Sequence, residues 1–258
     1  MNLPTKHVLG FPVAALPFDA QIKAILDWAS KRKSKVVCVA NAHMLTEAYW
    51  CPDLGSILKQ ADLVTPDGMP IVWMLRLLGA ANQDRVAGLD IISALCQRAS
   101  RHHVSVFFLG SHLAILERMQ ARLKKEFPDL DIAGMEPLPF RPLTPEEDEA
   151  MIRMVNESGA GVVMVSLGCP KQEYWMAQHR AKIQAVMIGL GGAFPVYAGL
   201  FNRAPRWVRE WGLEWAYRLI QEPRRLWRRY CITIPPFIWL ALKQLLSRPK
   251  SQHCISKS

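Results

Sequence analysis

Short apolar runs that lack polar–apolar alternation constrain the fold of this chain most strongly. They cover residues 36–40, 104–109, 162–167 and 185–190, and helix-like patterns separate them. Such strands are buried on both faces, as in parallel sheets covered by helices. Helical periodicity covers residues 18–30, 68–78, 89–100, 112–127, 145–158 and 170–182. The pattern therefore predicts an α/β fold with a doubly wound, mostly parallel sheet.

The C-terminal part of the chain has a different composition. Residues 201–258 carry a formal charge of +9, whereas residues 1–200 carry +1, and five of the nine tryptophans lie in this last part. Trp207, Trp211 and Trp215 recur every four residues, followed by Leu219, which predicts a single helical stripe. We therefore predict an α/β domain over residues 1–200 and a basic, tryptophan-rich helical appendage over residues 201–258. Its partner should be anionic with an apolar component.

Composition excludes several classes of protein. Half of the residues are hydrophobic and 21% are charged, which is typical of a globular protein. The six cysteines include no CxxC pair and the histidines show no ligand spacing, so we predict no metal and no cofactor. The apolar run 232–246 is interrupted by Pro235, Pro236 and Lys243, and it is too short to span a bilayer. Free thiols, in a chain that starts without a leader-like pattern, predict the cytoplasm.

Polar residues follow several of the predicted strands, where open α/β sheets bind their ligands. Asp67 lies in TPDG (65–68), which follows the apolar stub 61–64, and it directly precedes Gly68. It could cap the next helix or act as a general base, and the residues alone leave both alternatives open. Lys171, in GCPKQE (168–173), would place a cation beside the N–H groups of a helix start, which suits a diphosphate. GLGGAF (189–194) lacks the third glycine of the dinucleotide fingerprint, so we predict no nicotinamide site.

The order of the motifs is more specific than any one of them. The chain contains, in sequence, NAHM (41–44), DLVTPDGMPIVW (62–73), RVAGLD (85–90), VFFLG (106–110), GCPKQE (168–173), GLGGAF (189–194) and RAPRWVREWGLEWAYRLIQEPRRLWRRY (203–230). Over about residues 36–230 it resembles the WecG/TagA/CpsF family of glycosyltransferases. The resemblance implies a Rossmann-like catalytic domain, with the appendage completing the active site at the membrane.

The resemblance also implies an activity. Members of this family transfer a sugar from a UDP-sugar to a polyprenyl-diphosphate-linked sugar, at the cytoplasmic face of the bacterial membrane. They invert the anomeric carbon, form a β-glycosidic bond and need no metal. We therefore expect a peripheral protein of the inner membrane, which acts in exopolysaccharide or other cell-surface polysaccharide assembly and binds an anionic membrane surface.

Residue roles are carried over by position. The resemblance implies that Asp67 is the catalytic base and that Asn41 and Gln172 line the substrate pocket. Gly189 and Gly191 are expected at the same site. Without a metal, cationic or N–H groups must hold the diphosphate. The candidates are Arg85, Lys171, Gln172, Arg218, Arg224, Arg225 and Arg228.

Three departures from the family pattern bear on the donor. Val39 stands where a threonine is common, Pro195 stands where an aspartate is common, and residues 134–140 replace a tyrosine-containing loop. We therefore expect a hexose donor such as UDP-glucose. The acceptor sugar and the linkage position are not determined by these residues.

Two other functions compete with the transferase. The basic appendage with its tryptophans is compatible with a nucleic-acid-binding module. Because the excess charge is confined to the appendage, and the strand-end motifs would then have no role, we predict no nucleic-acid partner. The second alternative is a non-catalytic peripheral membrane scaffold, in which Asp67 is only a helix cap. The tryptophan stripe could also be covered by a second copy of the chain, as a homo-oligomer in solution.

Overall fold

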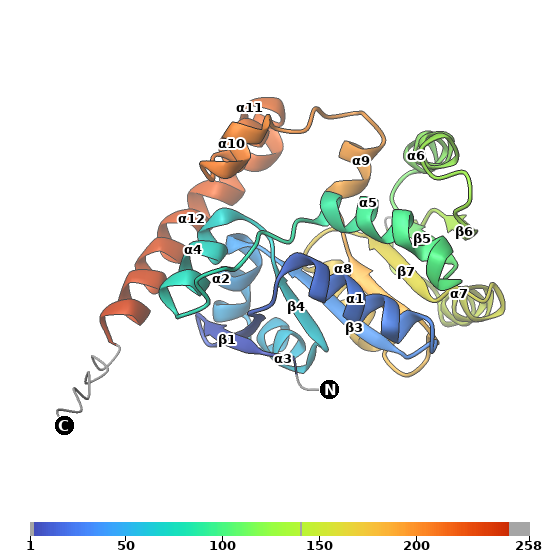
Figure 1. Cartoon of the computed structure of the whole chain (residues 1–258), viewed down its shortest axis with the longest axis horizontal. Coiled ribbons are helices and arrows are strands. Elements are labelled where there is room, and N and C mark those ends of the chain that lie inside the picture. Colours follow the sequence, from blue (N-terminus) through green and yellow to red (C-terminus); the bar gives the residue numbers. More distant parts are fainter. Residues whose placement is uncertain (1–2, 140, 248–258) are drawn as a thin grey trace, which may run out of the picture.

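The computed structural model describes residues 3–139 and 141–247, and its centre is a six-stranded parallel sheet (Figure 1). The strand order is β4-β3-β8-β7-β5-β6, and every neighbouring pair is parallel. The strands are β3 (Lys35–Ala40), β4 (Leu63–Pro66), β5 (Val106–Gly110), β6 (Ile132–Glu136), β7 (Val162–Ser166) and β8 (Val186–Gly189). The predicted α/β parallel sheet is confirmed, and all carboxyl ends of its strands lie at one edge.

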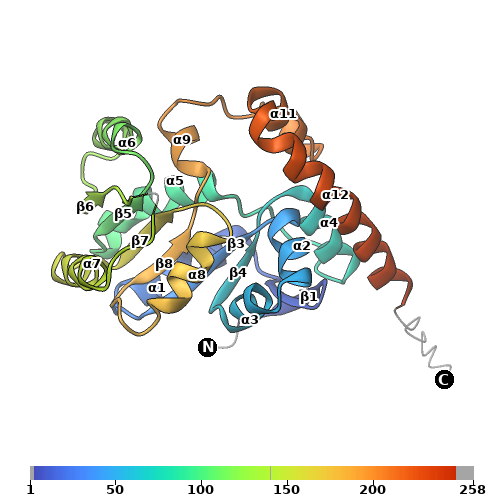
Figure 2. The same cartoon turned by 180° about the vertical axis from the view of Figure 1, so that it is seen from behind.

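Helices cover both faces of the sheet, which explains the unbroken apolar runs. One face packs against α1 (Phe18–Ala29), α5 (Gly88–Ala99) and α6 (Leu113–Glu126). The other packs against α2 (Ala42–Trp50), α3 (Pro52–Gln60), α4 (Met69–Leu77), α7 (Pro145–Glu157) and α8 (Lys171–Gln178), as the two opposite views show (Figures 1 and 2). Within β3, Val36 and Cys38 enter one core, whereas Val37 and Val39 enter the other.

Several elements had no clear signal in the sequence. β1 (Thr5–Val8) and β2 (Phe11–Ala14) form a separate antiparallel hairpin, whose turn residues Leu9 and Gly10 both have positive φ. The helices α2 and α3 fill the segment between β3 and β4. The edge strand β6 is only half-buried along its length. It therefore lacks the continuous apolar run by which the central strands are recognised in the sequence. These elements are set by packing and by turn geometry, which periodicity does not report.

The C-terminal part is helical, but the predicted single stripe is wrong. After α9 (Ala193–Tyr197), the chain forms α10 (Arg206–Glu210), α11 (Glu214–Gln221) and α12 (Pro223–Leu246). Gly212 has a φ of 71° and turns the chain between α10 and α11, so Trp207 and Trp215 lie on different helices. A side chain at Gly212 would also meet the Trp73 ring 2.6 Å away, so this close approach requires glycine.

The last helix packs along the α/β domain. α12 continues through Pro235 and Pro236 and lies against α2, where Phe237 and Leu240 join the core that contains Met44. Its far end is held by Gln244, whose side chain accepts a hydrogen bond from the Leu9 N–H (2.8 Å) and donates one to the His7 carbonyl (2.6 Å). In the part of the chain that the structure describes, no helix has the length and apolar character needed to cross a bilayer.

Candidate active site

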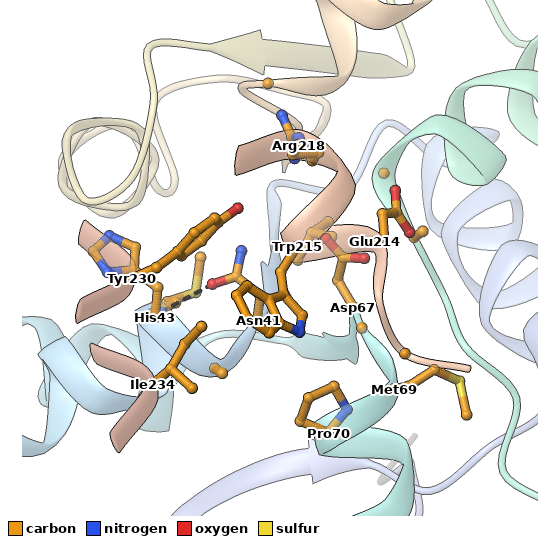
Figure 3. A pocket seen from close by; sticks show the side chains of 18 of the residues that line it. Asn41, His43, Asp67, Met69, Pro70, Glu214, Trp215, Arg218, Tyr230 and Ile234 are labelled. Atoms are coloured by element: carbon orange, nitrogen blue, oxygen red, sulfur yellow. Dashed lines mark hydrogen bonds between the residues drawn. The ribbon is translucent and has the colours of Figure 1, made fainter. Parts of the chain in front are cut away.

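A cavity of about 610 Å³ opens at the carboxyl edge of the sheet. Its walls come from the ends of β3, β4, β7 and β8, from α4, and from α10, α11 and α12. Figure 3 shows Asp67, Glu214 and Arg218 at one end, and His43 and Tyr230 at the other. Sheet and C-terminal helices therefore build one site together, at the edge where parallel α/β proteins bind ligands.

Asp67 is held rigidly at the end of β4. Its N–H donates to the Ala40 carbonyl of the neighbouring strand at 2.7 Å, and Gly68 follows with a φ of 96°. Gly68 is the N-cap of α4, and no side chain makes a capping hydrogen bond there. The carboxyl group instead lies in the cavity, beside that of Glu214 (Figure 3). Asp67 therefore makes no capping hydrogen bond to α4, and its role as a base stays a prediction.

The surroundings of Asp67 make its carboxylate a stronger base than usual. Desolvation raises its pKa to about 7, and the negative charge of Glu214 adds to this, while Arg85 and Arg218 oppose it. A carboxyl group with a pKa near neutral pH is well matched to taking a proton from a hydroxyl group. The site can therefore support general-base chemistry.

Arg85 joins the α/β domain to the C-terminal helices. Its guanidinium forms one ion pair with Glu214 of α11 and a second, at 3.2 Å, with Asp90 of α5. Asp90 in turn pairs with Arg203, which precedes α10. Because the Arg85 side chain is only 12% exposed, these pairs are shielded more than ordinary surface pairs. The network holds α11 over Asp67.

Gln172 and Glu173 form a buried polar pair at the start of α8. The Gln172 amide nitrogen donates to Glu173 Oε1 at 2.8 Å. The amide oxygen of Gln172, a cavity-lining residue, is buried and has no hydrogen-bond partner among the described residues. Burial raises the pKa of Glu173 to about 7.

Gly189 and Gly191 leave room for this amide. A Cβ at Gly189 would lie 2.7 Å from the Gln172 amide nitrogen, and one at Gly191 would lie 3.0 Å from its amide oxygen. Gly191 also has a φ of 40°, in the left-handed region that glycine adopts without strain. The two glycines of the β8 loop therefore shape the floor of the cavity, and both line it, as the sequence predicts.

Asn41 caps α2 and lines the cavity at the same time. Its side-chain oxygen accepts a hydrogen bond from the Met44 N–H at 3.1 Å, so its amide N–H groups are left for other partners. Figure 3 shows this side chain between Tyr230 and Asp67.

The structure separates the predicted cations into two groups. Arg85, Arg218 and Arg225 line the cavity together with Asp67 and Gln172. Lys171, Arg224 and Arg228 are exposed and lie outside the lining. Glu214 and three further arginines also line the cavity without having been predicted, namely Arg203, Arg209 and Arg229. In a segment with an arginine at every few positions, the turn at Gly212 and the packing of α12 on α2 decide which of them face inward.

A second polar cluster lies near the other end of the cavity. His43, Glu47 and Cys169 place three potential ligand atoms within 4.8 Å of one another, so these residues could hold a metal ion. The neighbouring Arg229 opposes a cation there. Burial, and then the positive charge of Arg229, lower the pKa of His43 to about 3, which keeps the imidazole neutral. That the chain needs no metal stays a prediction.

Fold and site together define a class of protein. A parallel α/β sheet whose strand ends carry a carboxyl group of raised pKa, enclosed by arginines, is suited to group transfer from a substrate with an anionic leaving group. The chain belongs to the WecG/TagA/CpsF family of glycosyltransferases, whose family model matches residues 6–251. The family predicted from the motif order is therefore confirmed.

One curated relative covers nearly the whole chain. It is the N-acetylglucosaminyldiphosphoundecaprenol N-acetyl-beta-D-mannosaminyltransferase of Bacillus spizizenii (strain ATCC 23059 / NRRL B-14472 / W23). The two are 32% identical over 249 residues, which is 94% of each chain. The likeness therefore includes the C-terminal helices that line the cavity.

Proposed function

We propose that this glycosyltransferase moves a sugar from a UDP-sugar to an undecaprenyl-diphosphate-linked sugar, with inversion and without a metal. The observation that carries the proposal is the position of Asp67, a carboxyl group of raised pKa in a cavity lined by arginines. A base for the acceptor hydroxyl and cations for a diphosphate, together in one cavity, are what a single displacement at an anomeric carbon needs.

The transfer is a single displacement. The acceptor hydroxyl oxygen attacks the anomeric carbon while Asp67 takes its proton, and the bond from that carbon to the UDP oxygen breaks. The electron pair of that bond leaves with UDP. Arg85, Arg218 and Arg225 are placed to stabilise the charge that grows on the diphosphate, since all three line the cavity. Attack opposite the leaving group gives the inverted, β-linked product.

The relative suggests the acceptor. Its name specifies an N-acetylglucosaminyl-diphosphoundecaprenol acceptor and an N-acetylmannosaminyl donor group. We propose the same acceptor for this chain, in cell-surface polysaccharide assembly. Two donors are therefore candidates, the predicted UDP-glucose and the UDP-N-acetylmannosamine that the relative's name suggests. Of the departures from the family pattern that bear on the donor, Val39 lines the cavity, whereas residues 134–139 do not, and Phe140 lies outside the described residues.

The C-terminal helices are suited to a membrane surface. Trp207, Trp211, Trp227 and Trp239 are exposed, and Arg224 and Arg228 are exposed on the first turns of α12. Aromatic side chains with arginines bind the interface of an anionic bilayer, where each cation contributes about 1 kcal/mol. We propose a peripheral protein on the cytoplasmic face of the bacterial inner membrane. Flotation with anionic vesicles but not with neutral ones is expected. A stable oligomer that binds neither anionic nor neutral vesicles would instead favour the homo-oligomer, in which a second copy covers the tryptophans.

A donor panel tests the transferase itself. Purified protein, N-acetylglucosaminyl-diphosphoundecaprenol in detergent and separate UDP-sugars would be assayed for UDP release and for the elongated lipid. Release that needs both a donor and the acceptor, and that persists in a chelator, supports the proposal and identifies the donor. Vesicle binding without release from any donor would favour the membrane scaffold.

A further inference from the structure

The cavity does not end at its polar part. It continues between α4 and α12 as an apolar lane, which we define by the lining residues Trp73, Met74, Leu77, Ile234, Phe237, Ile238, Ala241, Leu242 and Leu245. Met74, Phe237 and Ala241 are buried and form the floor. Trp73, Leu77, Ile238 and Leu242 are 44%, 64%, 52% and 54% exposed and form the rims. None of these side chains carries a charge.

The lane is a continuous feature of one helix face. Ile234, Ile238, Ala241, Leu242 and Leu245 follow the spacing of residues that share a face of an α-helix. From Ile234 to Leu245 this face extends about 16 Å along α12. The opposite wall is the apolar side of α4, whose first residues follow Asp67 and Gly68 directly. The lane and the proposed base are therefore parts of one cavity.

Charge changes along the same cavity. Arg218, Arg225 and Arg229 line its polar part, and Ile234, at the start of the lane, lies five positions after Arg229 on α12. Figure 3 shows Ile234 and Pro70 on the same side of Asn41 and Asp67, away from Arg218. A cluster of cations that passes into an uncharged apolar groove matches a ligand with a diphosphate at one end and a long hydrocarbon at the other.

We propose that the lane binds the first isoprenoid units of the acceptor's polyprenyl chain. This proposal rests on the proposed function, because it assigns part of the same lipid-linked acceptor. The polyprenyl chain lies between α4 and α12, with Ile238 and Leu242 against it, while the acceptor diphosphate meets Arg229, which lines the cavity next to the lane and is not among the arginines proposed for UDP. The lane thus selects acceptors by the length of their hydrocarbon, before the sugar reaches Asp67.

Two acceptors with the same sugar diphosphate test this. One carries the undecaprenyl chain and the other a single isoprenoid unit, which is too short to fill the lane, and both are assayed in the same detergent. We expect the wild type to show a KM at least about tenfold lower for the long chain, from the apolar area that the lane buries. Ile238→Glu should reduce the ratio of the two KM values to near one.

Ile232→Glu is the matched control. Ile232 lies on the same helix, is 51% exposed against 52% for Ile238, and does not line the cavity. It should keep the wild-type ratio of KM values. Thermal melts of both variants check that α12 still packs against α2. Measuring in detergent removes any effect of vesicle binding.

Three results would overturn the proposal. The wild type could show equal KM values for both chains, which would mean that no hydrocarbon subsite exists. Ile232→Glu and Ile238→Glu could change the ratio equally, which would assign the effect to an added charge on α12 and not to the lane. Transfer to neither acceptor by the wild type would refute the proposed function itself.

Discussion

Glu214 of α11 and Asp67 at the end of β4 lie together in one cavity, although 147 positions separate them in the chain. Glu214 is bonded to Arg85 and acts on Asp67 through its charge. The negative charge of Glu214 raises the pKa of Asp67, and the C-terminal helices supply that charge. The strength of the proposed base therefore depends on the docking of the appendage.

The first prediction concerns this pair. Glu214→Gln removes a negative charge beside Asp67 and releases Arg85, and both changes favour the ionised carboxylate. We expect the acid limb of kcat/KM to move toward lower pH, while the rate at the plateau falls roughly three- to tenfold because the base is weaker. Rate measurements from pH 5 to 9 check this. Glu210→Gln, which removes an exposed carboxylate paired with Arg206, is the control. An acid limb that stays in place or moves upward in Glu214→Gln would contradict the assignment.

The raised pKa of Asp67 also predicts a cost in stability. The folded state holds the proton of Asp67 up to a pH of about 7, whereas the unfolded chain releases it near the ordinary value of 3.8. The native state thus binds more protons than the unfolded state between these values, so this group lowers stability as the pH rises through that window. Asp67→Asn should raise Tm at pH 8 by several degrees and have a smaller effect at pH 4. A variant that melts lower than the wild type at pH 8 would contradict this.

A third prediction concerns the orientation of Gln172. Glu173→Gln keeps an oxygen that accepts from the Gln172 amide and removes the ionisable group, so we expect activity within about twofold of wild type at pH 7. Glu173→Leu removes the acceptor, so the amide can turn its N–H groups toward the cavity. We expect the KM for one substrate to rise roughly tenfold, with a smaller change in kcat. Equal losses in both variants would show that the pair has only a packing role.

A substitution at Gly192 tests whether Arg218 contacts the donor, because an added side chain would displace the guanidinium. A Cβ at Gly192 would lie 2.8 Å from an Arg218 guanidinium nitrogen, and the backbone there has an ordinary φ of −65°. Gly192→Ala should therefore displace Arg218 without backbone strain and raise the KM of the donor several-fold. Arg218→Lys should have an effect of similar size, because a lysine loses the planar, two-pronged contact with a phosphate. Unchanged kinetics in Gly192→Ala would mean that Arg218 does not contact the substrate.

The sequence predicts the scaffold well, because strands buried on both faces leave continuous apolar runs. Asp67, Asn41, Gln172, Gly189 and Gly191 are found from strand ends and motif order, and the structure brings them into one cavity. These residues can be predicted because they lie at or soon after the ends of strands, and the carboxyl ends of parallel strands meet at one edge of the sheet.

The C-terminal helices are less predictable. The positive φ of Gly212 breaks the expected stripe, and the packing of α12 on α2 decides that Arg229 faces the cavity whereas Arg228 does not. Glu214 has no distinguishing pattern in the sequence, because its role comes from Arg85, far away in the chain. Long-range contacts of this kind are outside what periodicity can report.

The most direct test of the account is the turnover of Asp67→Asn with the donor and acceptor that the wild type uses. Asparagine has almost the same shape but cannot take the proton, so kcat should fall by about 10²- to 10⁴-fold. Binding of UDP, followed by calorimetry, should stay within a few-fold of wild type, because the arginines and Gln172 are unaltered. A variant that keeps most of its kcat would show that Asp67 is not the base, and the proposed mechanism would be wrong.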